Sequence, residues 1–342
     1  MKTPNFWRKG GFWSDVLFVF SLVYLIYIRI IRWKQSDGSE PFHADVPVVC
    51  IGNIVAGGSG KTPVALAIAQ YFISIGLRPA FLSRGYGGKI SKKANAPVLV
   101  DPTAHTADEV GDEPLLLSLT APCWIGSDRI ASAIAATENG ADIIIMDDGL
   151  QNPSLYKDLT FAVFDGAFGA GNERLIPAGP LRDDLRTAMQ DAHAVIVLGE
   201  DKRKIAARLS HTHPILTAEL QPHNMPEDTE NSNQYIAFAG IGLPEKFFTM
   251  LTEKMELNVL QEIPFADHHP YSAQDEAKLL TLAQKKQATL LTTTKDFVRL
   301  SPEMQKDVAV IPVDVMWHDP TALALLIKDY LTDFPIEPAS GK

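Results

Sequence analysis

Cysteine is scarce in this sequence, with only Cys50 and Cys123 among 342 residues. Both lie in apolar stretches without the spacing of a metal site, so we expect buried, reduced thiols in the cytosol. Positive charge is also in deficit, and a formal net charge of −10 argues against a general nucleic-acid-binding protein. Internal repeats and long low-complexity tracts are missing. A content of 46% hydrophobic and 21% charged residues indicates a globular protein.

The chain is longer than one compact core of typical size, which suggests two domains. Between residues 220 and 234 the sequence becomes polar and loses its periodicity, and this favours a domain boundary. Strand-like runs alternate with helical patterns, so the predicted fold class is α/β, with a mostly parallel sheet flanked by helices. We expect an N-terminal helical segment at 1–35, a larger α/β core at 36–225 and a smaller C-terminal α/β domain at 226–342.

The N-terminal segment is strongly apolar. Its uncharged run from Val16 to Ile28 is shorter than the roughly 20 residues that span a bilayer, and a longer run includes Asp15 and Arg29. Aromatic residues typical of membrane interfaces accompany it, namely Trp7, Trp13, Tyr27 and Trp33. No small-residue cleavage site follows, which argues against a signal peptide, and a buried core helix is the other alternative. We predict a membrane-anchoring helix that spans the bilayer or is partly inserted.

Residues 46–76 contain the most informative motif. An apolar run from Val46 to Ile51 leads into a glycine-rich loop, and helical spacing begins after Lys61 and Thr62. Glycines let backbone N–H groups surround phosphate oxygens, and the helix N-terminus adds a favourable dipole. The lysine of such a loop reaches the β- and γ-phosphates of a nucleotide, and the threonine hydroxyl ligates Mg²⁺. The predicted nucleotide-binding residues are Val55, Ala56, Gly57, Gly58, Ser59, Gly60, Lys61 and Thr62.

This loop departs from the usual G-x-x-x-x-G-K-[ST] pattern, because Val55 stands at the position of the first glycine. Gly57 and Gly58 still keep the loop open. A glycine-rich turn before an ordinary helix is the alternative interpretation.

Carboxylates at two places are candidates for metal binding and proton transfer. Asp147 and Asp148 follow an apolar run at 141–146, where a Mg²⁺ ligand opposite a phosphate-binding loop is expected. Asp112 and Glu113 precede an apolar helical stretch. For this second pair a solvated helix N-terminus, where the dipole favours acids, is the alternative.

Basic residues in loops are candidates for contacts with phosphate groups. Arg84 lies in the stretch SRGYGGK at the end of a strand-like run at 79–83, although a surface turn has the same composition. In the C-terminal part, His268 and His269 precede a predicted helix near 273–285, where His268 could also be a helix cap. The other basic candidates are Arg129, Arg174 and Arg182.

Several motifs in this order resemble the tetraacyldisaccharide 4′-kinase family of lipid A biosynthesis in Gram-negative bacteria. The resemblance runs from the N-terminal helix to about residue 315, and the family shares the missing first glycine of the loop. The motifs are GNIVAGGSGKTP, SRGYGG, VGDEP, GSDR, DDGLQ, IPAGPLR, FADHHPY and TTTKD.

The resemblance implies transfer of the γ-phosphoryl group of ATP to the 4′-hydroxyl of a tetraacyl disaccharide 1-phosphate, which gives lipid IVA. Asp112 would orient and deprotonate the hydroxyl, while His268, or His269 as second choice, adjusts Asp112. The implied catalytic residues are Asp112, His268, Lys61 and Arg129. The implied metal ligands are Thr62, Glu113, Asp147 and Asp148, and the implied substrate-binding residues are Arg84, Arg182 and His269.

The implied cofactors are ATP and Mg²⁺, and the implied partners are the acylated lipid and the inner-membrane surface, with no nucleic acid and no obligate protein partner. The catalytic domains would face the cytoplasm, where ATP is available. Two positions depart from the family pattern: Thr294 stands where an acid is common, and Asp183 where glutamate is common.

Two other interpretations remain. A membrane-associated ATPase switch of the partition or cell-division type shares a glycine-rich GKT loop, but it usually has an extra lysine where this chain has Val55 and Ala56. A kinase for a soluble small molecule would not need the N-terminal helix.

Overall fold

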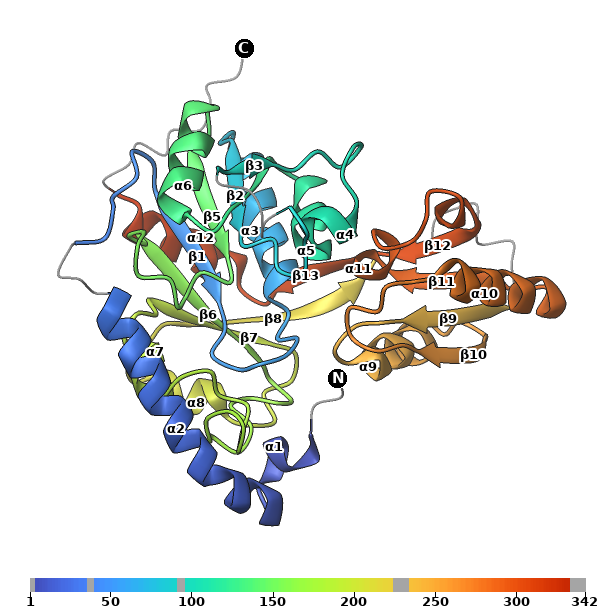
Figure 1. The fold of residues 1–342 in the computed structure, drawn as a ribbon, viewed down its shortest axis with the longest axis horizontal. Coiled ribbons are helices and arrows are strands. Elements are labelled where there is room, and N and C mark those ends of the chain that lie inside the picture. The colour runs from blue at the N-terminus through green and yellow to red at the C-terminus, as the bar shows by residue number, and fades with distance from the viewer. Residues whose placement is uncertain (1–3, 36–39, 91–95, 224–233, 333–342) are drawn as a thin grey trace.

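The computed structural model describes residues 4–35, 40–90, 96–223 and 234–332. Two helices lead into a larger α/β unit, and a smaller α/β unit projects from one side of it (Figure 1). The predicted α/β fold class is confirmed, and so is the burial of both cysteine thiols, which are free.

The larger unit is built on a nine-stranded sheet of order β13-β8-β7-β6-β1-β5-β2-β4-β3. All neighbouring strands are parallel except the β13–β8 and β4–β3 pairs. The strands are β1 (Val48–Gly52), β2 (Pro79–Ser83), β3 (Val98–Leu99), β4 (Cys123–Ile125), β5 (Ile143–Asp147), β6 (Leu159–Asp165), β7 (Ala194–Leu198), β8 (Ile215–Pro222) and β13 (Val313–Trp317). The central strands are buried on both faces, which explains why their sequences are continuous apolar runs.

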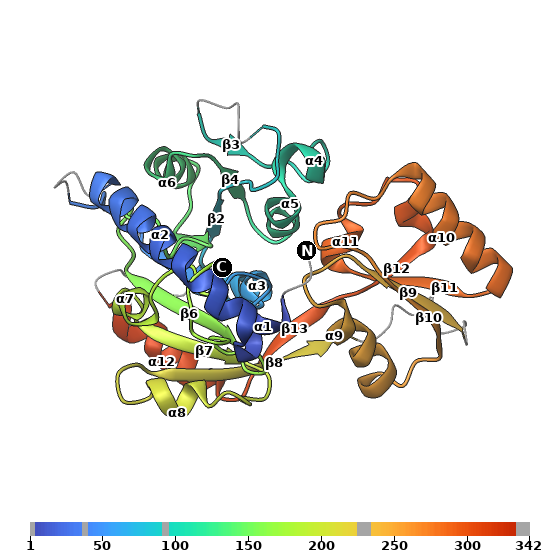
Figure 2. The ribbon, with the colours of Figure 1, turned by 60° about the horizontal axis from the view of Figure 1, so that its bottom comes forward.

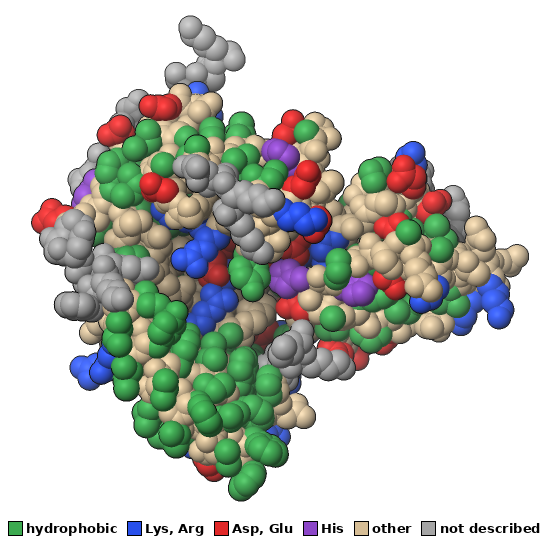
Figure 3. Space-filling view, in the orientation of Figure 1, with side chains coloured by type: hydrophobic (Ala, Val, Ile, Leu, Met, Phe, Trp, Pro, Cys, Tyr) green, Lys and Arg blue, Asp and Glu red, His purple; other side chains and the backbone are tan. Residues whose placement is uncertain are grey.

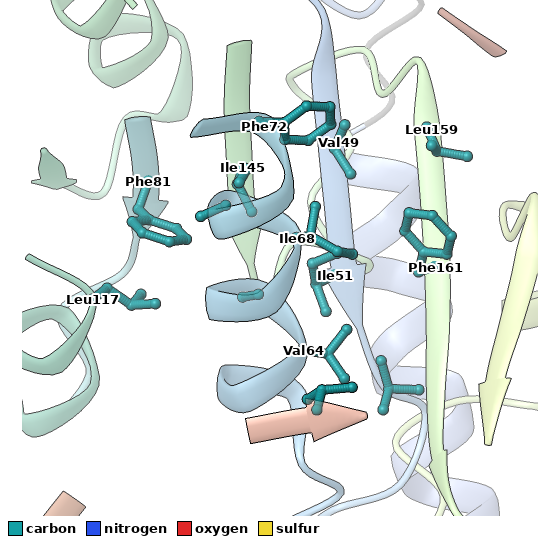
Figure 4. Packing of buried hydrophobic residues seen from close by; sticks show 14 of the residues in the cluster. Val49, Ile51, Val64, Ile68, Phe72, Phe81, Leu117, Ile145, Leu159 and Phe161 are labelled. Atoms are coloured by element: carbon teal, nitrogen blue, oxygen red, sulfur yellow. The ribbon is translucent and has the colours of Figure 1, made fainter. Parts of the chain in front are cut away.

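Helices cover both faces of this sheet. In β1, Val49 and Ile51 pack on the face covered by α3 (Figure 4), whereas Val48 and Cys50 point to the opposite face. The first face carries α3 (Lys61–Ser74), α5 (Asp112–Ser118) and α12 (Pro320–Tyr330), and the second carries α6 (Arg129–Glu138), α7 (Leu185–Gln190) and α8 (Ile205–Leu209). The short helix α4 (Ala107–Val110) precedes α5.

The smaller unit has its own four-stranded parallel sheet, of order β10-β9-β11-β12. Its strands are β9 (Tyr235–Ala239), β10 (Val259–Pro264), β11 (Thr289–Thr293) and β12 (Val308–Ile311). Its core lies on both sides of this sheet, against α9 (Pro244–Thr249) on one face and α10 (Ala273–Lys286) on the other. The short helix α11 (Thr294–Phe297) follows β11 directly.

The C-terminal end of the described chain differs from the predicted domain division. After β12 the chain returns to the larger unit, where β13 pairs with β8 and α12 packs on the sheet. Leu323, Leu326 and Ile327 supply the apolar face that makes this docking favourable. The predicted boundary between 225 and 226 lies outside the described residues. The smaller unit therefore occupies 234–311, and residues 313–332 belong with the larger unit instead of with the domain predicted at 226–342.

Two N-terminal helices lie on the outside of the larger unit. They are α1 (Asn5–Lys9) and α2 (Phe12–Gln35). Figure 2 shows α2 running along the surface of the larger unit without entering its core.

Candidate active site

The site lies where β1 and β5 end. From β1 the chain passes through α3 to β2, on the β5 side of the sheet, whereas after β5 it crosses to β6 on the opposite side. Open α/β sheets bind ligands at such a reversal of strand order, outside the carboxyl ends of the strands. The glycine-rich loop and the Asp147–Asp148 pair both lie there.

The phosphate-binding loop is held open by its surroundings. Gly60, which precedes α3, has a φ of 82°, in the left-handed region that favours glycine. The amide of the buried Asn53 donates to Ser59 Oγ at 2.7 Å, and its Oδ1 accepts from Lys61 Nζ at 3.2 Å. Within the described part of the chain, the backbone N–H groups of 57–60 donate to no protein acceptor. They are therefore available to phosphate oxygens.

The first two residues of the predicted loop have a different role. Val55 forms an isolated antiparallel bridge with Leu181, and the N–H of Ala56 donates to the carbonyl of Pro180 at 2.7 Å. An N–H group that is bonded within the protein cannot also hold a phosphate. With the N–H of Ala56 occupied, the N–H groups of 57–60 remain for a phosphate, and position 55 carries a buried side chain that packs in the core.

The acidic pair at the end of β5 faces this loop. Asp148 Oδ1 lies 2.6 Å from Lys61 Nζ, and its Oδ2 lies 2.9 Å from Arg182 Nη1. Burial raises the pKa of Asp148, but the charges of these two partners outweigh it and lower the pKa. Asp147 is buried, and its Oδ1 has no hydrogen-bond partner among the described residues. Burial and the nearby Glu113 raise its pKa to about 7.

The four predicted metal ligands do not form a ready-made cation site in this structure. In the part of the chain that the structure describes, no group of three or more His, Cys, Asp or Glu side chains could hold a metal ion. Asp148 is engaged in ion pairs, and Glu113 contacts Lys295. Mg²⁺ in phosphoryl-transfer sites often uses one or two carboxylates together with water and phosphate oxygens. The unpartnered oxygen of Asp147 therefore fits a cation that arrives with phosphate groups.

Asp112 and His268 meet across the two units. Asp112 begins α5 of the larger unit, and His268 follows β10 in the smaller one. His268 Nδ1 donates to Asp112 Oδ2 at 2.8 Å. Burial raises the pKa of Asp112, but the hydrogen bond from His268 and the charges of Lys295 and Arg299 bring it down to about 2. The same hydrogen bond raises the pKa of His268.

Sequence reasoning missed two cations at this contact. Lys295 Nζ lies 3.1 Å from Glu113 Oε1 and 3.8 Å from Asp112 Oδ2. Arg299 Nε lies 3.7 Å from the same Asp112 oxygen. Lys295 belongs to the TTTKD motif, but its partners lie on α5 of the other unit, beside α11 (Figure 2). The motif was the only signal that could have indicated it.

The smaller unit also approaches the phosphate-binding loop itself. A Cβ built at Gly242, after β9, would lie 3.5 Å from the backbone nitrogen of Gly58. Lys246 of α9 forms an ion pair with Asp165 at the end of β6. In Figure 3, basic side chains and histidines gather at the hollow between the two units.

Two predicted arginines lie beside each other at the ends of β2 and β4. Arg129 is buried, and its Nη1 donates to the carbonyl of Ser83 at 2.9 Å and to that of Gly126. Burial and the charge of the exposed Arg84 lower the pKa of Arg129 to about 10. No carboxylate pairs with Arg129 within the described residues. A buried cation beside a second arginine suits a phosphate group.

His269 does not reach Asp112. Its Nε2 lies 3.2 Å from Asp275 Oδ2, and its ring lies 4.6 Å from the ring of Phe265. These contacts tie His269 to the N-terminus of α10, within the smaller unit. The histidine that approaches the carboxylate is therefore His268.

One face of α2 docks on the loop that carries Arg182. Ser14 Oγ donates to the carbonyl of Ala178 at 2.7 Å, and Ser21 Oγ donates to that of Leu175 at 2.8 Å. One turn further, Tyr24 Oη donates to the carbonyl of Arg182 at 3.2 Å. The remaining faces expose Phe12, Trp13, Val16, Phe18, Val19, Phe20, Leu22, Val23, Ile26, Tyr27 and Ile30.

This helix is long and apolar enough to cross a membrane over residues 12–31, and only 11% of that stretch is buried. Hydrophobic side chains dominate the surface where Figure 1 places α1 and α2 (Figure 3). A soluble core helix would be mostly buried, so the exposed face supports membrane association.

Comparison with known proteins identifies the family of this chain. A family model described as tetraacyldisaccharide-1-P 4′-kinase matches residues 13–332. The chain belongs to this family. The tetraacyldisaccharide 4′-kinase of Rhodospirillum rubrum is 45% identical over 332 residues, which cover 96% of this chain and 97% of that protein. The kinase of the same name from Hyphomonas neptunium is 42% identical, with both chains covered over 100% of their length.

A solved structure shares the fold. It is the crystal structure of "apo" form LpxK from Aquifex aeolicus in complex with ATP, with a TM-score of 0.74 and 24% sequence identity. The match covers 93% of this chain and 99% of that one. Membership of the tetraacyldisaccharide 4′-kinase family confirms the predicted resemblance. It gives no support to a partition-type ATPase switch.

Proposed function

We propose that this protein transfers the γ-phosphoryl group of ATP to the 4′-hydroxyl of a tetraacyl disaccharide 1-phosphate. The family assignment and the names of the relatives support this reaction. The observation that carries it is the Asp112–His268 contact beside the phosphate-binding loop. A carboxylate for the acceptor hydroxyl and a lysine for the phosphates are the parts that phosphoryl transfer requires.

The nucleotide phosphates would lie on the N–H groups of residues 57–62, with Lys61 Nζ at the β- and γ-phosphates. Lys61 is within reach of these phosphates, because it contacts Asp148 at the sheet edge where the phosphates would lie. Bound Mg²⁺ would neutralise charge on the phosphates, held by Asp147 and the Thr62 hydroxyl, with Glu113 and Asp148 around it. The ATP complex of the Aquifex aeolicus protein with the same fold is consistent with nucleotide binding here.

Asp112 would hold the acceptor hydroxyl in line with the γ-phosphate and accept its proton. A carboxyl pKa of about 2 makes Asp112 a weak base. A weak base suffices here because the transition state of phosphoryl transfer is loose, and catalysis depends mainly on positioning and charge stabilisation. His268 keeps one carboxylate oxygen occupied, which orients the other toward the hydroxyl. Arg129, Arg84 and Arg182 would bind the phosphate groups of nucleotide and lipid.

The lipid substrate would reach the site from a membrane surface on which α2 lies. The polar face of α2 is bonded to the protein at Ser14, Ser21 and Tyr24, so this face is not available to lipid. A helix that is covered on one side and apolar on the others suits partial insertion along the interface better than a free span. We place the protein at the inner membrane, with both α/β units on the cytoplasmic side.

The decisive experiment is a phosphoryl-transfer assay with γ-labelled ATP, Mg²⁺ and the tetraacyl disaccharide 1-phosphate. A parallel ATPase assay without lipid is the control. Labelled lipid with little lipid-independent hydrolysis is the expected result. Steady ATP hydrolysis without labelled lipid would refute the proposed function.

A further inference from the structure

A buried ion pair lies behind the loop that carries His268. Asp296 is fully buried, and the side chain of Arg299 is 6% exposed. Arg299 Nη2 donates to Asp296 Oδ1 at 2.7 Å. The reaction described above assigns no role to Asp296. Burying two charges carries a desolvation penalty that their attraction does not always offset, so the presence of this pair needs a reason.

Asp296 organises the chain around it. It accepts hydrogen bonds from three places that flank the His268 loop: the residue directly after β9, the last residue of β11 and the segment before α10. Besides Arg299, the donors are the N–H of Gly240 at 2.7 Å, Tyr271 Oη at 2.6 Å and Thr293 Oγ1 at 2.6 Å. Oδ1 accepts from Gly240, Tyr271 and Arg299, whereas Oδ2 accepts from Thr293, and the bond to Gly240 fixes the backbone there.

Arg299 and Gly240 hold the backbone on both sides of His268. The N–H of His268 donates to the carbonyl of Gly240 at 3.0 Å. Arg299 Nη2 donates to that same carbonyl at 3.0 Å, and its Nη1 donates to the carbonyl of His269 at 3.1 Å. These bonds stabilise an unfavourable backbone, because His268 has a φ of 56° in the left-handed region.

We infer that Asp296 is a positioning residue for His268: with Arg299 and Gly240 it fixes the backbone from which the imidazole reaches Asp112. Arg299 extends the same network to the catalytic carboxylate, since its Nε lies 3.7 Å from Asp112 Oδ2. The inference rests on the proposed function, because its consequence is measured as lipid phosphorylation.

The test is a double-mutant cycle of Asp296→Asn and His268→Ala, with kcat measured at saturating ATP and lipid. Asparagine keeps an acceptor for Gly240 and Tyr271 but loses the charge that binds Arg299. A misplacement near 1 Å at such a site lowers rates about 100-fold, so we expect Asp296→Asn to lower kcat about 10- to 100-fold in the wild-type background. In the His268→Ala background the further loss should be less than about 3-fold, because the group that it positions is gone.

Asp275→Asn is the matched control. Asp275 contacts the neighbouring His269 from the start of α10 and makes no contact with Asp296 or Asp112 among the described residues. This variant should keep kcat within about 2-fold in both backgrounds. Equal fold-losses from Asp296→Asn in the two backgrounds would overturn the inference, and so would an unchanged kcat in the wild-type background.

Two further measurements keep the inference testable when Asp296→Asn folds poorly or activity is lacking. Tyr271→Phe removes one hydrogen-bond donor to Asp296 without changing a buried charge. It should lower kcat less than Asp296→Asn does, and this loss should also be smaller in the His268→Ala background. In spectra of histidine-labelled protein, Asp296→Asn should shift the ring signal of His268, whereas Asp275→Asn should shift only that of His269. An unshifted His268 signal would refute the positioning role. A wild-type protein without lipid phosphorylation would refute the proposed function instead.

Discussion

Lys61 is paired within the protein in this structure, with Asp148 at 2.6 Å and Asn53 at 3.2 Å. Similar pairs recur around the site, at His268 with Asp112 and at Lys295 with Glu113. Each of these three side chains therefore contacts an acid of the same site. When phosphates bind, Lys61 can exchange one anionic partner for another, which avoids burying an unpaired charge. The ion pairs of this site can thus be replaced by contacts with bound phosphates. Three predictions concern single residues.

Lys61→Ala should lower kcat about 100- to 1,000-fold, because the charge aimed at the β- and γ-phosphates disappears. Lipid phosphorylation with labelled ATP measures the effect. Lys202→Ala is the control, since Lys202 is exposed and, among the described residues, forms an ion pair with Glu200 alone. Near-normal activity of Lys61→Ala would contradict the role assigned to the loop.

Asp112→Asn should lower kcat about 100-fold or more while nucleotide affinity stays roughly constant. The amide keeps the shape of the side chain but cannot accept the proton of the hydroxyl. Steady-state kinetics with varied ATP and varied lipid separate the two effects. If only the KM for ATP changed, Asp112 would be a metal or capping residue instead of the proton acceptor.

Lys295→Met should lower kcat about 10-fold, because Glu113 and Asp112 lose a cation that contacts both from the smaller unit. Burial acts against the charge of Lys295, but Glu113 and Asp112 raise its pKa, so the side chain is charged at neutral pH. Lys295→Arg should restore part of the activity. Lys285→Met, at an exposed position of α10, should have no effect; equal losses in both methionine variants would refute the role.

Among the elements, α2 and the loop at 172–182 are bonded to each other and act together. The loop bonds to α2 on one side and to the phosphate-binding segment on the other, where Val55 pairs with Leu181. Arg182, at the end of this loop, contacts Asp148. The element that we expect to touch lipid is therefore one loop away from the phosphate site.

Val19→Lys together with Val23→Lys should abolish binding to anionic lipid vesicles. Both side chains are more than 60% exposed on the apolar face of α2 and make no part of its docking contacts. Charged residues there would have to enter the apolar region of the bilayer. Vesicle co-sedimentation measures the binding. Leu325→Lys, on the exposed side of α12, is the control; unchanged binding of the double variant would show that α2 does not insert.

At the scale of the whole molecule, the described residues of the two units meet largely through charged side chains, and Val298 of the smaller unit also packs against the core of the larger one. His268 contacts Asp112, Lys295 contacts Glu113, and the cores of the two units are separate clusters. Interfaces of this kind permit relative motion of domains more easily than apolar ones. Because His268 is titratable, we expect its contact with Asp112 between the units to respond to pH.

The pKa of His268 is raised in the folded state by its hydrogen bond with Asp112. A group with a raised folded pKa stabilises the fold fully below its free pKa of about 6.5, and this stabilisation is lost as the pH rises through the folded pKa. The melting temperature of the wild type should therefore exceed that of His268→Gln by more at about pH 6 than at about pH 9. A difference that grows with pH would contradict the charged contact.

The sequence alone determined much of this protein. Local physics explains why: β2 has the predicted bounds because an apolar run between breakers needs no distant partner to define it. The phosphate-binding loop was predictable for the same reason, since its glycines, Lys61 and α3 are contiguous. Tertiary structure decided the rest. Only the fold could show that β13 and α12 return to the larger unit, that Ala56 bonds to Pro180, and that His268 instead of His269 meets Asp112 across 156 positions. Such contacts depend on how two separately folded sheets are placed, and no local pattern encodes that placement.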